Sequence, residues 1–152
     1  MASKSFKDTF ELLKSAREKA VEAAGQTDSE LADAYYRSAY YMLYKACSLG
    51  HSIFAACAQN GVDMRGGVFS WASRDFDDLS RMLLTRFYRE GNYPKGDDAL
   101  EQFEVWLARV RNYLNSLANE SALLKSTRPH FDSTAWKMEN RNGWDSRSMM
   151  LE

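Results

Sequence analysis

In the middle of a long helical pattern lies the tyrosine-rich segment Ala39-Tyr40-Tyr41-Met42-Leu43-Tyr44-Lys45-Ala46. Apolar residues cover nearly the whole circumference of this helix, which is typical of a helix at the centre of a bundle. The pattern opens at Thr27-Asp28-Ser29-Glu30, which has the spacing of a capping box, and closes at the stop signal Asn60-Gly61. Gly50 can bend or break so long a helix. The segment therefore predicts the central helix of an all-α fold.

Apolar residues at helical spacing predict further helices on both sides of the central one. Gly25 and Gly91 supply stop signals, and the acidic pair Asp77-Asp78 gives favourable charge at a helix start. Either Asp97 or Asp98 opens the last helix. The expected flanking helices cover about residues 6–24, 68–71, 77–91 and 97–117. The chain is thus expected to be an antiparallel all-α bundle of about five helices.

The composition fits one folded domain. Of the 152 residues, 45% are hydrophobic and 13% aromatic, which is enough to build a core. The net charge of −1 gives no overall attraction to nucleic acid, so an RNA contact would require a local basic patch. Residues 1–124 are expected to form the bundle, and residues 125–152 a polar tail that carries Trp136 and Trp144. That tail is expected to be disordered, or docked on the bundle or on a partner subunit.

The two cysteines indicate a reducing compartment. Cys47 and Cys57 fall in one helical pattern, about 15 Å apart along its axis, which is too far for a disulfide. Neither has the neighbouring ligands of a metal site. No apolar run approaches the roughly 20 residues of a membrane span, and residues 1–5 lack the apolar core of a signal peptide. We therefore expect a cytoplasmic protein without a membrane segment, metal or cofactor.

Four segments follow one another in a recognisable order: Ala39–Ala46, Arg65–Phe69, Tyr88-Arg89-Glu90-Gly91-Asn92-Tyr93 and a closing helix at Ala99–Leu117. In this order they resemble the small stand-alone prokaryotic HEPN proteins, over about residues 6–118. The resemblance implies an antiparallel helical bundle that usually dimerises. It also implies one of two activities, which are metal-independent RNA cleavage in toxin–antitoxin or defence systems, and non-catalytic partnership with a small nucleotidyltransferase.

By this resemblance the candidate catalytic residues are Arg86, Asn92 and Tyr93. The candidate RNA- or phosphate-binding residues are Arg89, Arg37 and Lys45. Arginines can hold a phosphate bidentately and stabilise charge on it. The same arginines also complement the negative end of a helix dipole, and the tyrosines of the central helix are most simply core and interface residues.

The sequence departs from the family pattern at Asn92 and at Lys45, which stands where many relatives carry a histidine in the tyrosine-rich helix. Active members carry an arginine, then four to six residues, then a histidine, whereas here five residues separate Arg86 from Asn92. RNA cleavage by a 2′-hydroxyl needs a proton acceptor and a proton donor, and asparagine exchanges no proton. His51 and His130 stand elsewhere in the sequence. The sequence thus leaves several functions open.

The leading expectation is an RNA-associated ribonuclease toxin or defence component that acts as a dimer. The first alternative is a non-catalytic, nucleotide- or RNA-binding or regulatory partner of a nucleotidyltransferase. A toxin–antitoxin pairing would instead supply an antitoxin as the partner. The last alternative is a scaffold bundle that binds neither RNA nor nucleotide.

Overall fold

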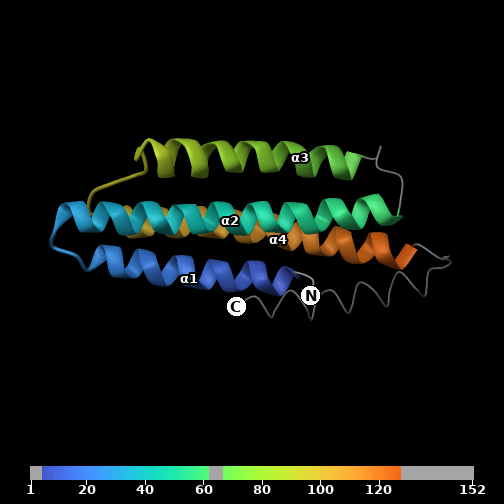
Figure 1. Ribbon diagram of the computed structural model, residues 1–152, viewed down its shortest axis with the longest axis horizontal. Helices are drawn as coiled ribbons and strands as arrows, with labels where there is room; N and C mark the ends of the chain where they lie inside the picture. Colours follow the sequence, from blue (N-terminus) through green and yellow to red (C-terminus); the bar gives the residue numbers. More distant parts are fainter. Residues whose placement is uncertain (1–4, 62–66, 128–152) are drawn as a thin grey trace.

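The computed structural model describes residues 5–61 and 67–127, which form mainly long helices (Figure 1). The helices are α1 at Phe6–Ala24, α2 at Ser29–Gly61, α3 at Gly67–Ser80 and α4 at Ala99–Thr127. A π-helix, η1, spans Arg81–Arg89 and continues α3 without a break. No strand occurs in the described ranges, so the all-α prediction is confirmed.

The expected count of about five helices is not confirmed, because two expected helices are parts of one. The described chain is helical from Gly67 through to Arg89, and the break expected before Asp77 does not exist. Ala72 and Leu79 are buried on either side of that position, and Phe76 between them packs against the core. A buried stripe at helical spacing runs through the acidic pair, so the pair lies inside a helix and does not begin one.

Glycines and aspartates end and begin the helices at most of the expected places. Gly25 closes α1, and its N–H donates to the Val21 and Glu22 carbonyl oxygens. The start of α2 differs by one residue from the expected capping box at Thr27. Asp28 Oδ1 accepts from the Glu30 N–H at 2.9 Å, so Asp28 caps this helix.

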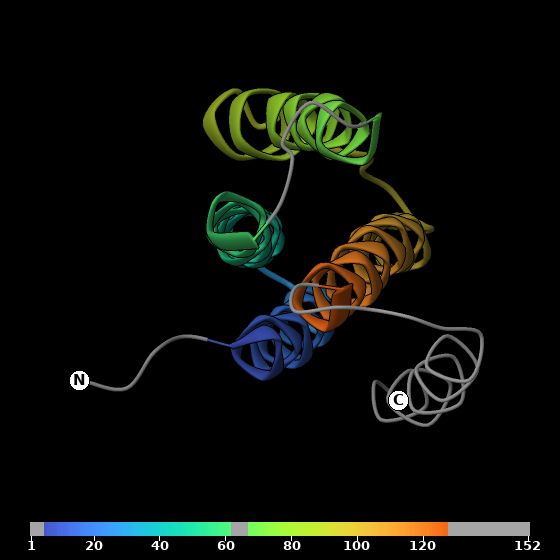
Figure 2. The same ribbon diagram turned by 90° about the vertical axis from the view of Figure 1, so that its right-hand side faces the viewer.

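Successive helices run in opposite directions (Figure 1). The view along the helices places α3 and η1 on one side, α2 and α4 in the middle, and α1 on the opposite side (Figure 2). The segment Ala39–Ala46 thus lies at the centre, as expected, and Tyr40, Leu43 and Ala46 are fully buried there. Phe103, Val110, Leu114 and Leu117 supply the facing surface of α4.

Gly50 does not break α2, which is helical on both sides of it. A Cβ atom at this position would overlap the Cδ2 methyl group of Leu114 on α4. Gly50 and Leu114 are both buried, so the glycine allows two core helices to approach closely.

The last helix is longer than expected. It continues to Thr127, beyond Leu117 and beyond the expected end of the bundle at residue 124. The predicted polar tail, with His130, Trp136 and Trp144, lies outside the described residues. Within the described ranges, no helix combines the length and apolar character that crossing a bilayer requires.

Candidate functional site

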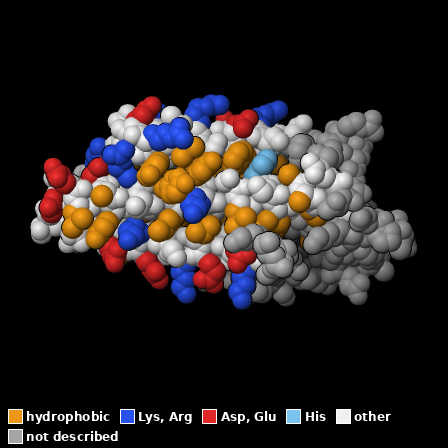
Figure 3. Space-filling model, viewed as in Figure 1, with side chains coloured by type: hydrophobic (Ala, Val, Ile, Leu, Met, Phe, Trp, Pro, Cys, Tyr) orange, Lys and Arg blue, Asp and Glu red, His pale blue; other side chains and the backbone are white. Residues whose placement is uncertain are grey.

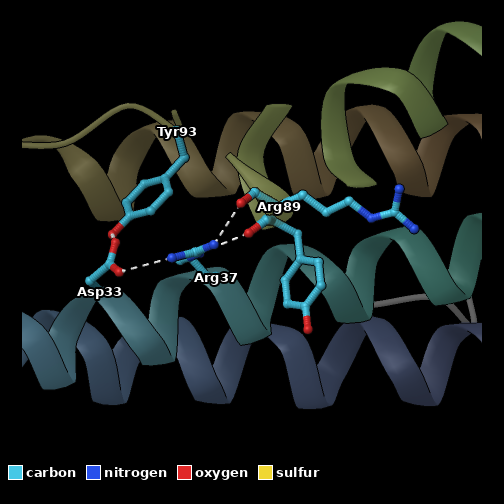
Figure 4. Close-up of polar contacts among 5 residues, drawn as sticks. Asp33, Arg37, Arg89 and Tyr93 are labelled. Atoms are coloured by element: carbon cyan, nitrogen blue, oxygen red, sulfur yellow. Dashed lines mark hydrogen bonds and ion pairs between the residues drawn. The ribbon is translucent and has the colours of Figure 1, made fainter. Parts of the chain in front are cut away.

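The C-terminal end of η1 is held by the side chain of Arg37, which reaches it from α2 (Figure 4). Arg37 Nε donates to the Tyr88 carbonyl oxygen at 2.7 Å, and Arg37 Nη2 donates to the Arg89 carbonyl oxygen at 2.8 Å. The last carbonyl groups of a helix have no partner inside the helix, and one guanidinium here satisfies two of them. Asp33, one turn earlier on α2, lies 3.5 Å from Arg37 Nη1. Arg37 is therefore a helix cap supplied from a distant part of the chain.

Tyr93 binds the other oxygen of the Asp33 carboxylate. Its hydroxyl donates to Asp33 Oδ1 at 2.5 Å, and its ring packs against Tyr36 and Tyr40 with centroids 5.6 and 5.7 Å away. Burial raises the pKa of Tyr93 well above its ordinary value, and the hydrogen bond to Asp33 raises it further. The Tyr93 hydroxyl therefore keeps its proton near neutral pH and joins the turn after η1 to α2.

Gly91 turns the chain out of η1 with a φ of 72°, in the left-handed region that favours glycine. The Glu90 N–H donates to the Thr85 carbonyl oxygen at 3.0 Å, and the Asn92 N–H donates to the Arg86 carbonyl oxygen at 2.9 Å. The second bond spans one residue more than the corresponding bond of a Schellman cap, because the π-helix has wider turns. The predicted stop signal at Gly91 is confirmed.

The three candidate catalytic residues lie in different surroundings. Arg86 and Asn92 are exposed, whereas only 6% of Tyr93 is exposed. Asn92 Nδ2 donates to Glu90 Oε1 at 3.3 Å. Arg89 is exposed, and its side chain extends away from Asp33 and Arg37 (Figure 4). Neither the Arg86 nor the Arg89 side chain forms an ion pair with any residue that the structure describes.

Tyr88, which directly precedes Arg89 in η1, belongs to a group of partly exposed rings, which we call the tyrosine face and define as Tyr41, Tyr44 and Tyr88. The Tyr41 ring lies 4.6 Å from Tyr88 and 5.9 Å from Tyr44, between centroids. Lys45 is exposed, and its ammonium lies 5.8 Å from the Tyr41 ring centroid. Figure 3 shows a band of hydrophobic side chains along α2, with Lys and Arg side chains within and beside it.

His51, the one histidine in the described ranges, is bound into a different part of the molecule. Its Nδ1 lies 2.8 Å from the Tyr113 hydroxyl, which itself donates to the Ala72 carbonyl oxygen at 3.1 Å. Its ring stacks on Phe76 with centroids 4.5 Å apart. Burial lowers the pKa of His51, although the charge of Asp77 opposes the shift. These contacts are those of a neutral histidine that positions α3 against α2 and α4.

Four of the six candidate residues thus lie in or just after the last turn of η1, and Lys45 lies near the Tyr41 ring of the tyrosine face. Arg37 also reaches this place, but its donors are taken up by backbone carbonyl groups and Asp33. The sequence reasoning missed Asp33, although its position four residues before Arg37 is the usual spacing of a helical ion pair. The exposed part of the site carries both cations and aromatic rings. Such cations can bind phosphates, and such rings can stack on bases.

In the described ranges, no group of His, Cys, Asp or Glu side chains is arranged to hold a metal ion. Comparison with family models, with curated proteins and with solved structures finds no match to this chain.

Proposed function

We propose that this protein is a HEPN-like RNA-associated bundle that binds single-stranded RNA on the tyrosine face and at the last turn of η1, and does not cleave it. The observation that carries the proposal is that Arg86 and Arg89 are exposed without ion-pair partners in the described structure, and that Arg89 directly follows Tyr88, whose ring lies 4.6 Å from that of Tyr41. Guanidinium groups bind phosphate oxygens, and exposed tyrosine rings stack on bases without regard to sequence. Lys45 adds a third cation.

Binding is favoured over cleavage because, among the described residues, no histidine lies near Arg86, and the nearby Glu90 carboxylate accepts a hydrogen bond from Asn92. The Tyr93 hydroxyl is buried, is bonded to Asp33 and has a raised pKa. Asn92 cannot exchange a proton, and His51 lies farther along α2, where its Nδ1 is 2.8 Å from the Tyr113 hydroxyl. A 2′-hydroxyl bound here would meet cations but, among the described residues, no histidine to accept its proton.

The test is fluorescence anisotropy with a labelled single-stranded poly-uridine RNA, titrated at several salt concentrations. A variant with both Arg86→Gln and Arg89→Gln is expected to weaken binding. It should also reduce the slope of log K against log salt by about 1.4, since each lost contact to single-stranded RNA removes about 0.7. Gel analysis of the same RNA after long incubation should show intact RNA for wild type and variant alike.

Exposed lysines on α1 provide a matched control. Lys7→Gln with Lys14→Gln removes the same amount of charge away from the tyrosine face and should leave the slope unchanged. If the two double variants lost the same amount of RNA affinity, net charge alone would explain the loss, and the proposed site would be refuted. Fragmented RNA that depends on Arg86 would show instead that the protein is a nuclease. Light scattering on the same samples tests the homodimer that the resemblance implies.

A further inference from the structure

A second surface, on the other side of α3, has a different chemistry. An open groove of about 570 Å³ lies between α3 with the start of η1 and α4, and we call it the α3–α4 groove. Its walls include carboxylates, indole rings and apolar side chains; the residues used below are Trp71, Asp75, Asp78, Met82, Trp106 and Arg109. The groove shares no lining residue with the tyrosine face.

Two carboxylates lie side by side in this groove. Asp75 and Asp78 are three residues apart on α3, which makes them neighbours on one face of the helix. Asp75 is half-buried, and neither residue forms an ion pair within the described part of the chain. Burial raises the pKa of Asp75 and the charge of Asp78 raises it further, although the charge of the neighbouring Arg74 opposes the shift. A cation bound between the two carboxylates would stabilise their charged forms and so oppose the upward shift.

The groove already shows how it accommodates a guanidinium group. Arg109 lies over the Trp106 ring, with its Cζ atom 4.6 Å from the ring centroid. The second indole, Trp71, lies on the same helix as the two carboxylates and is 38% exposed. Its ring centroid is 6.5 Å from that of Tyr113, and no cation lies over it among the described residues. Aromatic faces attract guanidinium groups more often than ammonium groups.

We propose that the α3–α4 groove binds an arginine side chain of a partner protein, with the guanidinium held by Asp75 and Asp78 against the exposed ring of Trp71. Arginine fits better than lysine because its planar group can bind carboxylates and stack on an indole at the same time. A protein segment fits better than a free small cation because the groove is open to solvent and extends to apolar side chains such as Met82. Those side chains would contact the residues that flank the arginine.

The test uses a fluorescein-labelled peptide with one arginine flanked by leucines, and the same peptide with citrulline in place of arginine. Anisotropy with the full chain should show binding of the arginine peptide and at least about fivefold weaker binding of the uncharged one. Asp75→Asn with Asp78→Asn should weaken binding of the arginine peptide about tenfold. Arg109→Gln should strengthen it severalfold, because this variant removes a like charge from the groove.

Asp77→Asn is the matched control, since it removes an exposed carboxylate from the same helix outside the groove. It should reduce binding far less than the double variant does. Equal affinities for the arginine and citrulline peptides would overturn the proposal, and so would an equal effect of Asp77→Asn. A third outcome would also overturn the proposal. If free agmatine displaced the peptide with an affinity equal to that of the peptide, the occupant of the groove would be a small cation.

Discussion

The rings of Tyr40 and Tyr93 lie 5.7 Å apart in one buried cluster, yet their hydroxyl groups are in opposite situations. The Tyr93 hydroxyl donates to Asp33 at 2.5 Å. The Tyr40 hydroxyl is fully buried and has no hydrogen-bond partner among the described residues. The two tyrosines therefore allow the contribution to stability of a hydrogen-bonded hydroxyl to be compared with that of an unbonded one in the same buried cluster.

Replacing each tyrosine with phenylalanine should have opposite effects on stability. Tyr93→Phe removes a hydrogen bond to a charged group and should lower the free energy of unfolding by about 1–2 kcal/mol. Tyr40→Phe removes a buried hydroxyl without a partner and should leave the free energy unchanged or raise it by up to about 1 kcal/mol. Urea denaturation followed by circular dichroism measures both. A larger loss for Tyr40→Phe than for Tyr93→Phe would contradict this account.

Arg37 should be difficult to replace even by another cation. Arg37→Lys keeps the charge, but one ammonium cannot reproduce the planar pair of bonds to the Tyr88 and Arg89 carbonyl groups. We expect it to lower the free energy of unfolding by about 1 kcal/mol and Arg37→Met by about 2 kcal/mol. Arg74→Met, at an exposed site on α3, is the control for loss of one positive charge. Hydrogen exchange should show the added opening at residues 88–92, and uniform opening across the chain would count against a cap.

Gly50 and Leu114 should be energetically coupled. Gly50→Ala forces a methyl group into the Leu114 side chain and should destabilise by about 1–3 kcal/mol, despite alanine's better helix propensity. In a Leu114→Ala background the same change fills part of a cavity, so its cost should fall or change sign. A double-mutant cycle in urea measures the coupling. Gly25→Ala is the control, because a Cβ there meets nothing closer than 3.7 Å; additivity of the Gly50 and Leu114 effects would rule out the contact.

Stability should fall at alkaline pH. Burial raises the pKa of Tyr40, Tyr93 and Tyr113 in the folded state, so above the ordinary tyrosine pKa of about 10 the unfolded state loses protons that the folded state keeps. Protein stability is then intact below that pH and decreases as pH rises, by up to about 1.4 kcal/mol per pH unit for each tyrosine.

The Cys47 thiol should also lower protein stability as the pH rises, and its effect should begin at a lower pH than that of the tyrosines. Burial raises the pKa of its thiol to about 12, from an ordinary value near 8.5. Urea denaturation between about pH 8 and pH 11 measures both effects, with Cys47→Ala removing the thiol contribution and Tyr40→Phe removing that of one tyrosine. Unfolding free energies that stay constant to the upper end of this range would contradict the burial of these groups.

The helix boundaries could be predicted largely from local signals. Gly25 and Gly91 end helices where the sequence indicates, since a chain that must leave a helix favours glycine at that point. The pair Asp77-Asp78 misled the prediction because acidic residues also occur on exposed faces in the middle of helices. Gly50 misled it too, because a glycine that permits close helix packing looks the same in sequence as one that breaks a helix.

The candidate site was predictable in place but not in detail. The resemblance drew attention to residues 86–93, and these residues do lie together at one end of η1. The role of Arg37 had no local signal, because it depends on carbonyl groups 51 and 52 residues away. The burial of Tyr93 likewise depends on Tyr36 and Tyr40, which lie on another helix.

The π-helical form of η1 also determines how far apart Arg86 and Arg89 point. An α-helix has about 3.6 residues per turn, so side chains three positions apart are neighbours and could bind one anion together. A π-turn takes roughly one residue more, so the same two side chains diverge around the helix axis. A ligand that engages both must therefore present two separate negative groups, as consecutive phosphates of a polynucleotide do. A mononucleotide carrying a single phosphate would reach one arginine and leave the other in water.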